Sequence, residues 1–423
     1  MIYLPDIAKE ILHGRHLCQI KQAKALKQKE RWISAHLRKP KYSVSGRQRN
    51  TSRNRDIVVK KIDNLSDSYF KLYFRLCRED FHVLLTKVET HIGLIDEAQA
   101  IRSSGSPIHM KLRLASTLRF LAGGSYLDIA FAFEIDHKSV MTYVWQIIKA
   151  IDAVVDNIHF PFDDESKLRS LEAGFLKYCG GAFPGTVCAG DGVVFKIRKP
   201  PADEVDGNVQ SYFNRKGYFA YGMQGFVGPN CEFLSISSKL CSSSHDATQY
   251  IVSDFSMRLR AGDLPRWAHI VLDEAYPNKQ QELSPFRGKN LSTEQDSFNY
   301  YLSVHRQVVE RAFGLLVARW GVFWRPLQIK FSHIPLLVCV CCKLHNVCVE
   351  RFGAITTKID IARGDCQPGD NHEPLYTDGT GMYAGRRTDL EHTTSRNCLM
   401  QRLKQMGKVR PTHSIMHRRR ICA

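Results

Sequence analysis

This chain lacks the features that mark secreted and membrane-spanning proteins. Its longest apolar run, Ile334 to Cys342, is too short to cross a bilayer, which needs about 20 residues. The first residues, Met1 to Asp6, have neither the basic start nor the apolar core of a signal peptide. Internal repeats and low-complexity tracts are also missing. We therefore expect an intracellular protein with no membrane partner.

Acidic residues are scarce relative to basic ones. The chain has 42 Asp and Glu against 60 Lys and Arg, a net charge of +18, and an isoelectric point of about 9.4. This surplus favours a polyanionic partner, nucleic acid before membrane. Residues 1–65 are rich in Lys and Arg, and we expect them to form a flexible basic arm. Such an arm either binds phosphates and directs import into the nucleus or is a solvated extension.

The cysteines do not suggest a disulfide framework, because there are 13 of them, an odd number, and they are scattered. The densest group lies in an apolar helical stretch and could in principle hold a metal cluster. Buried free thiols in a reducing compartment are the favoured interpretation. The group consists of Cys339, Cys341, Cys342 and Cys348, with His345 among them.

Apolar residues recur at helical spacing in residues 66–160, which predicts an all-α domain. A helix that ends near Ala122, a glycine link, a short helix from Tyr126 and a longer helix from His137 have the spacing of a helix-turn-helix. In that geometry the last helix presents its first turns to the major groove of DNA. An ordinary three-helix packing element is the open alternative. The residues expected to face DNA are Lys138, Ser139, Thr142 and Tyr143.

Residues 161–350 change to strands separated by turns, followed by a long helix from Phe298 to Trp320. This pattern predicts an α/β domain with a sheet flanked by helices. Residues 351–423 form a polar, glycine-rich and basic tail with a short helix from Asp389 to Gly407. The expected strands are Val187–Ile197, Tyr218–Val227, Glu232–Lys239 and Ala268–Leu272, with a helix from Asp246 to Leu259 before the last.

Three acidic residues in different local sequences suggest the chemistry. Asp191 lies between glycines in an apolar strand-like run, Asp273 ends a second such run, and Glu310 lies inside the long helical pattern. Carboxylates bind hard divalent cations such as Mg²⁺. Two such ions about 4 Å apart stabilise both the attacking and the leaving oxygen of a phosphodiester. Arg306, one helical turn before Glu310, is either a salt-bridge partner or a phosphate contact.

The sequence segments around these acids resemble those of the PIF/Harbinger superfamily of DDE transposases. The long helix through Glu310-Arg311-Ala312-Phe313-Gly314 and Arg319-Trp320-Gly321 is similar to the C-terminal half of these enzymes. Asp191-Gly192 resembles their first catalytic block, and Leu272-Asp273 with Tyr276-Pro277 resembles the second. Ser244-His245-Asp246 is similar to their histidine–aspartate block, and Gly385–Asp389 to a tail motif. The likeness covers roughly residues 66–411.

The resemblance implies an RNase H-like nuclease domain in which Asp191, Asp273 and Glu310 hold two Mg²⁺ or Mn²⁺ ions. It also implies a DDE transposase that cuts and joins double-stranded DNA at transposon ends and acts as a homo-oligomer in the nucleus. Relatives depend on a Myb-like partner protein. Arg306 and Arg319 are expected to contact phosphates. His245 and Asp246 are secondary candidates near the metals.

Three positions depart from the family pattern: Val317 replaces a lysine, Glu274 replaces a small residue, and Ser242-Ser243-Ser244 replaces Pro-Gly-Ser. Two other functions therefore stay open. One is a domesticated or inactive transposase-derived protein that binds DNA without cutting it. The other is an RNA-directed nuclease of the RNase H type, which does not predict a helix-turn-helix.

Overall fold

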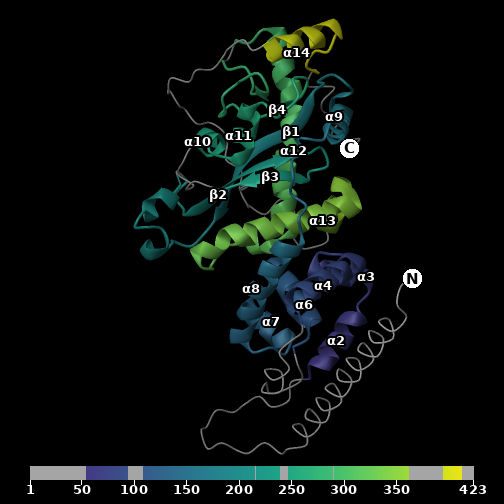
Figure 1. Cartoon of the computed structure of the whole chain (residues 1–423), viewed down its shortest axis with the longest axis vertical. Helices are drawn as coiled ribbons and strands as arrows, with labels where there is room; N and C mark the ends of the chain where they lie inside the picture. Colours follow the sequence, from purple (N-terminus) through teal and green to yellow (C-terminus); the bar gives the residue numbers. More distant parts are fainter. Residues whose placement is uncertain are drawn as a thin grey trace, which may run out of the picture.

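The computed structural model describes residues 54–93, 108–214, 216–238, 246–288, 290–361 and 394–411. Figure 1 shows two lobes along the long axis of the molecule, one of helices alone and one built around a sheet. Helix α13 (Ile334–Ile361) lies across the molecule where the lobes meet, and helix α14 (Thr394–Gln405) lies at the far end of the sheet lobe.

The first lobe contains helices and no strand in residues 54–93 and 108–154. Several of its helices begin at residues whose side chains cap the first turn. The Ser66 side chain accepts from the amide of Tyr69, and the Asp136 side chain accepts from the amide of Lys138. The turn before the last helix contains Glu134 with φ of 52°, a left-handed conformation. The helices are α2 (Arg55–Asp63), α3 (Asp67–Phe74), α4 (Arg78–Ile92), α6 (Met110–Leu121), α7 (Tyr126–Ala132) and α8 (His137–Val154).

Helix α2 overlaps the range expected to be a flexible arm. Val58 and Ile62 of this helix are buried, and Arg55 is only 1% exposed. The Arg55 Nε donates to the carbonyl of Glu134 at 3.1 Å. The turn before α8 is therefore supported by a segment that composition alone assigned to the arm. Residues 1–53 of that arm lie outside the described residues.

The second lobe contains a five-stranded mixed sheet in the order β3-β2-β1-β4-β5. The first three strands pair antiparallel, whereas β4 runs parallel to both β1 and β5. This mixed sheet with flanking helices is compatible with an RNase H-like fold. The strands are β1 (Thr186–Lys196), β2 (Ala220–Val227), β3 (Phe233–Ser237), β4 (His269–Val271) and β5 (Glu282–Leu283).

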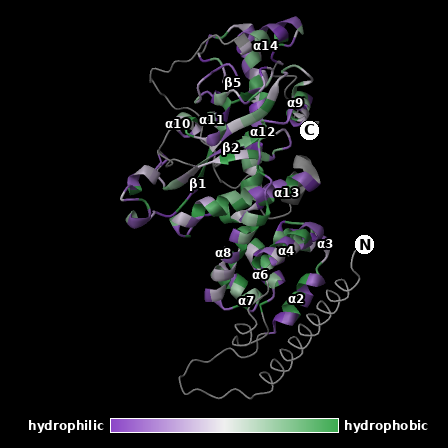
Figure 2. Ribbon diagram, viewed as in Figure 1, coloured by the Kyte–Doolittle hydropathy of each residue, from purple (hydrophilic) through white to green (hydrophobic). Residues whose placement is uncertain are grey.

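Apolar side chains alternate between the two faces of this sheet. Phe226 on one face packs with Phe255 of α11 (Asp254–Ala261), the two rings stacked 4.1 Å apart. Met223 belongs to the larger core cluster with Phe313 of α12 (Thr293–Arg319). Figure 2 shows the hydrophobic side of α12 and α13 gathered inside the molecule. Helix α12 is therefore held against the sheet by its buried side.

Two helical predictions differ from the structure. Residues that follow Phe162, expected to change directly to strands, first form α9 (Glu165–Cys179). The single helix expected from Asp246 to Leu259 is split into α10 (Asp246–Ile251) and α11, because Ser253 adopts extended backbone geometry and caps the second helix. Short 3-10 helices complete the lobe: η1 (Ala202–Glu204), η2 (Val209–Tyr212), η3 (Gly321–Trp324) and η4 (Phe331–His333).

The apolar helix α13 is a core helix of this protein. The segment Phe331–Arg351 is long and apolar enough to cross a membrane by length and composition, although the apolar run within it looked too short from sequence. However, 61% of the apolar window is buried inside the protein. Burial raises the pKa of the Cys341 and Cys342 thiols well above the usual range. In the described part of the chain, no cysteine or histidine of this helix belongs to a metal-binding group.

Candidate active site

Asp191 lies in the middle of β1, where neighbouring glycines allow other side chains to pack closely against the sheet. It pairs with Gly225 of β2. A Cβ atom added to Gly225 would lie 2.7 Å from the ring of Phe313, and one added to Gly190 would lie 2.8 Å from the Phe226 ring. Such distances are shorter than side chains tolerate. Gly225 therefore lets α12 approach the sheet next to Asp191, while Gly190 leaves room for Phe226 on the other face.

Asp273 follows the end of β4, which is the parallel neighbour of β1. Its carbonyl accepts from the amide of Tyr276 at 3.1 Å, which turns the chain away from the strand. The hydroxyl of Tyr276 donates to Gln224 Oε1 of β2 at 2.6 Å. Both groups are buried, so this bond fixes the loop after β4 to the sheet.

Glu310 and Arg306 lie one turn apart on α12, and Arg306 contacts all three acids. Its Nη1 is 2.6 Å from Glu310 Oε1 and 3.2 Å from Asp191 Oδ2. Its Nε is 3.8 Å from Asp273 Oδ1. Acids separated by up to 119 positions along the chain thus meet around one guanidinium. Sequence reasoning paired Arg306 with Glu310 through helical spacing but missed its central position.

At this site one positively charged side chain lies among three negatively charged ones. Burial lowers the pKa of Arg306, but the negative charges of Asp191, Asp273 and Glu310 outweigh burial and raise it overall. The Arg306, Asp191 and Asp273 side chains are 20–22% exposed, and that of Glu310 is 41% exposed. The cluster is therefore half-buried and open on the Glu310 side.

The donor chemistry of this cluster suits hard divalent cations. Since both distances share Nη1, the oxygens of Asp191 and Glu310 are no more than about 6 Å apart, a spacing that two bridging ions about 4 Å apart can span. Among the residues the structure describes, however, no three His, Cys, Asp or Glu side chains are already arranged to hold a metal ion. The guanidinium separates the acids. Metal binding at this position therefore requires Arg306 to move.

A buried polar chain connects the same three elements and was not anticipated. Thr186 Oγ1 is 2.9 Å from His269 Nε2 and 3.0 Å from His305 Nδ1. Burial, with the neighbouring His305, lowers the pKa of His269 to about 3, and burial lowers that of His305 to about 4. Both rings are thus neutral at neutral pH. They join the start of β1 to β4 and α12, the three elements that supply the acids.

The residues expected to face DNA are divided by the structure. Lys138 and Thr142 are exposed on the first turns of α8, while Ser139 is half-buried. Tyr143 packs inward, with the guanidinium of buried Arg113 over its ring at 4.3 Å. Only part of the predicted surface is therefore available to a partner in this conformation.

Two other expectations concern residues away from the acids. Arg319 is only 5% exposed, and its Nη1 lies 3.1 Å from His345 Nδ1. Arg319 therefore contacts helix α13, and its expected contact with a phosphate stays a prediction. His245 lies outside the described residues. Asp246 begins α10, and its side chain is likewise outside them.

Comparisons with known proteins cover the part of the chain that carries the three acids. Residues 190–346 match the family model described as DDE superfamily endonuclease, a range that includes Asp191, Asp273 and Glu310. The chain is similar to "Protein ALP1-like" from Arabidopsis thaliana, with 25% identity over 299 residues, 66% of this chain and 70% of the relative. No solved structure matches.

Proposed function

This chain is a Harbinger-type DDE transposase-like protein, and from that premise we propose that it is a DNA endonuclease that cuts and joins transposon ends. The observation that carries the proposal is the meeting of Asp191, Asp273 and Glu310 around Arg306. A strand centre, a strand end and a helix supply these acids. This arrangement concentrates negative charge where two hard cations are needed.

Asp191, Asp273 and Glu310 would hold two Mg²⁺ or Mn²⁺ ions. When bound, such ions activate the attacking oxygen and stabilise charge on the leaving oxygen. Arg306 would leave the acids and turn its planar donor fork to a DNA phosphate, a geometry that suits arginine. The Thr186 chain would keep the strands and α12 in register while this exchange of partners occurs.

The helical lobe would supply DNA affinity. Lys138 and Thr142 are exposed at the start of α8, and the chain carries a net charge of +18. Each phosphate that a lysine or arginine neutralises releases counterions, so binding would weaken as salt rises. The partner would be double-stranded DNA in the nucleus. The protein would bind it as a homo-oligomer, with or without a Myb-like protein.

Two departures from the family pattern weigh little against cleavage. Glu274 lies beside Arg287, with Oε1 3.7 Å from Nε, and the Glu274 carbonyl accepts from Arg287 Nη2 at 2.7 Å. Its extra negative charge is thus partly neutralised. Val317 is partly buried and packs against the core, so an apolar contact takes the place of the lysine that is usual at this position.

A second function is favoured by Arg306 itself. Because its guanidinium contacts all three acids, the cluster is electrostatically satisfied by the protein alone. A domesticated protein that binds DNA without cutting it would keep the same arrangement. The distinction lies in whether divalent ions replace the guanidinium.

Nicking of supercoiled plasmid that carries the DNA flanking the coding region tests the proposal. Wild type should nick in Mg²⁺ or Mn²⁺, and Asp191→Asn should lose at least 10²-fold of the rate while retaining DNA binding. Asp203→Asn, which removes an exposed acid of η1 in the same lobe, is the matched control and should cut normally. Equal nicking by wild type and Asp191→Asn would reject the assigned acids. DNA binding without nicking in wild type would favour the second function, and preference for an RNA–DNA hybrid would favour the RNase H-type reading.

A further inference from the structure

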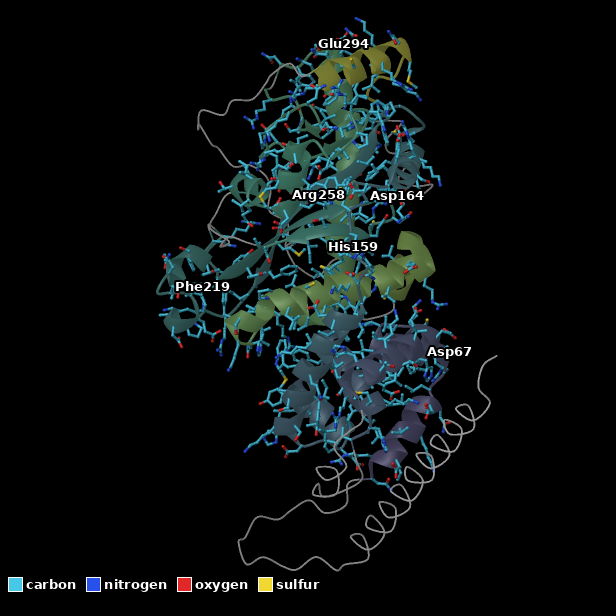
Figure 3. All side chains as sticks on the ribbon, viewed as in Figure 1. Asp67, His159, Asp164, Phe219, Arg258 and Glu294 are labelled. Carbon is cyan, nitrogen blue, oxygen red and sulfur yellow. The ribbon has the colours of Figure 1, made fainter. Side chains whose placement is uncertain are left out.

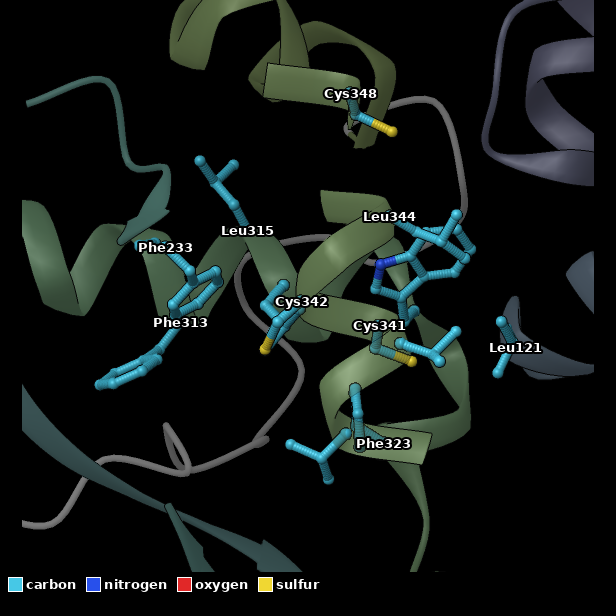
Figure 4. Packing of buried hydrophobic residues seen from close by; sticks show 14 of the residues in the cluster. Leu121, Phe233, Phe313, Leu315, Phe323, Cys341, Cys342, Leu344 and Cys348 are labelled. Atoms are coloured by element: carbon cyan, nitrogen blue, oxygen red, sulfur yellow. The ribbon is translucent and has the colours of Figure 1, made fainter. Parts of the chain in front are cut away.

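The two lobes meet at a seam where their backbones touch. A Cβ atom on Gly123, just after α6, would lie 3.0 Å from the backbone of Gly321, just after α12. A Cβ atom on Gly321 would lie 2.5 Å from the carbonyl oxygen of Ala122. Figure 4 shows Leu121 of the helical lobe facing Cys341 and Phe323, within one buried cluster. The lobes are therefore packed directly against each other.

Three arginines from three elements gather at this seam. Arg75 ends α3, and its carbonyl accepts from Cys348 Sγ of α13 at 3.5 Å. Arg319 ends α12 and contacts His345, one turn earlier on α13. Arg119 is on the last turn of α6, and its carbonyl accepts from the amide of Gly124 at 2.9 Å, beside the contact with Gly321.

The positive charges of these arginines repel one another. Burial lowers the pKa of Arg75, and the charges of Arg119 and Arg319 lower it further. Burial, and then the charge of Arg319, lowers the pKa of His345 to about 3, so this ring is neutral. In the described part of the chain, none of the three guanidiniums forms an ion pair with a carboxylate. Arginine cannot shed its proton in a protein, so the repulsion persists.

Hydrogen-bond donors at the seam are also unused. Arg75 Nε and Arg319 Nη2 are buried and have no hydrogen-bond partner, and neither has Trp320 Nε1. Arg319 is 5% exposed and Trp320 is fully buried. Buried donors almost always have partners, and a buried charge without one is costly. Three like charges, two of them on arginines with spare buried donors, are therefore an arrangement that an anion would complete.

We propose that Arg75, Arg119 and Arg319 form a phosphate-binding site at the seam between the lobes. Guanidinium groups bind tetrahedral oxyanions through paired N–H donors, and Arg75 and Arg119 are half-buried, so the group is reached from the surface. The phosphate is either a free anion or part of a DNA backbone. Since two arginines come from the helical lobe and one from the nuclease lobe, the ligand ties the lobes together. This site is independent of the acid cluster and of cleavage.

Thermal unfolding of the full chain in sodium phosphate and in sodium chloride at equal ionic strength tests the site. Phosphate at about ten times its dissociation constant should raise the Tm of wild type by roughly 2 °C beyond chloride. Arg119→Gln should abolish this increment. Because it removes one of three repelling charges, its Tm in chloride should equal or exceed that of wild type. Lys87→Gln, an exposed change of the same charge on α4, is the matched control and should retain the increment.

Two outcomes would overturn the site. One is an equal phosphate increment in Arg119→Gln, which means a general salt effect on folding. The other is an Arg119→Gln protein that melts below wild type in chloride and keeps its phosphate response, which means a structural arginine. A second arm uses a 20-base-pair duplex. If inorganic phosphate has no effect but the duplex stabilises wild type and Lys87→Gln more than Arg119→Gln, the bound phosphate is that of DNA; if neither ligand distinguishes the variants, the proposal fails.

Discussion

Replacing Arg306 with glutamine should have opposite effects with and without divalent ions. In the absence of metal, the variant leaves three carboxylates facing one another without their shared cation. Its free energy of unfolding should therefore fall. In Mg²⁺ the same three acids no longer have to release a guanidinium before they bind a cation. The stabilisation by Mg²⁺ should consequently be larger in Arg306→Gln than in wild type.

The size of the loss follows from distance and exposure. A charge pair at 4 Å interacts by about 4 kcal/mol at an effective dielectric constant of about 20, whereas exposed pairs give about 0.2–1 kcal/mol net. The pairs of Arg306 with Asp191 and Asp273 lie between these limits, with side chains 20–22% exposed. Glu310 is 41% exposed and its pair is discounted for solvent screening. We expect a loss of about 2–3 kcal/mol, or roughly 5 °C in Tm.

Thermal unfolding in EDTA, followed by titration with Mg²⁺, measures both effects. Arg311→Gln is the matched control, because Arg311 is the same residue type on the same helix but lies over the Tyr178 ring at 5.2 Å. It should not change the response to Mg²⁺. Isothermal titration should show tighter Mg²⁺ binding by Arg306→Gln. An unchanged Tm in EDTA together with an unchanged response to Mg²⁺ would refute the reasoning.

Two further predictions follow from buried and exposed charges. His269, His305 and His345 have folded pKa values of about 3, 4 and 3, below about 6.5 in the unfolded chain, so their contribution is intact above pH 6.5 and is lost as pH falls towards 4. Each of these histidines should lower the free energy of unfolding by about 2 kcal/mol between pH 7.5 and pH 5. Burial raises the pKa of Glu232 to about 7, so this carboxyl group partly offsets the loss. Urea unfolding at both pH values checks the net change, and an unchanged free energy of unfolding would contradict it. Lys138→Gln should weaken duplex binding and reduce the log–log salt slope by about 0.9, measured by fluorescence anisotropy across a salt series, and an unchanged slope would remove Lys138 from the DNA surface.

The fold was predictable where periodicity is strong and the buried face is wide. The apolar run at β1 and the long pattern of α12 were located within a few residues. Helix α9 was missed because its fully buried anchors are few, Leu168 and Phe175 among polar residues. Strand β5 has two residues and exists only because β4 pairs with it, which no local pattern encodes. Figure 3 labels Asp164, the residue that caps the start of α9.

The acids of the candidate site were predictable from residue type and neighbouring sequence, but their common partner was not. Helical spacing pairs Arg306 with Glu310, yet the contacts with Asp191 and Asp273 depend on how closely α12 approaches the sheet. That approach is set by Gly225 on a neighbouring strand. The contact of Arg319 with His345 was not expected either, because it depends on how α13 packs against α12. Long-range packing decides which charged residue meets a ligand and which is enclosed.

Helix α12 carries both charge clusters, and this raises the question of whether they are coupled. Glu310 and Arg319 are nine positions apart on one continuous helix, about 14 Å along its axis. Coupling requires an element with two arrangements that both sites favour differently. A continuous helix without such an alternative should transmit none. We therefore expect the stability changes of Arg306→Gln and Arg119→Gln to add within about 0.5 kcal/mol in the double variant. A larger deviation, measured by a double-mutant cycle in EDTA and chloride, would show that α12 shifts as a unit between the acids and the seam.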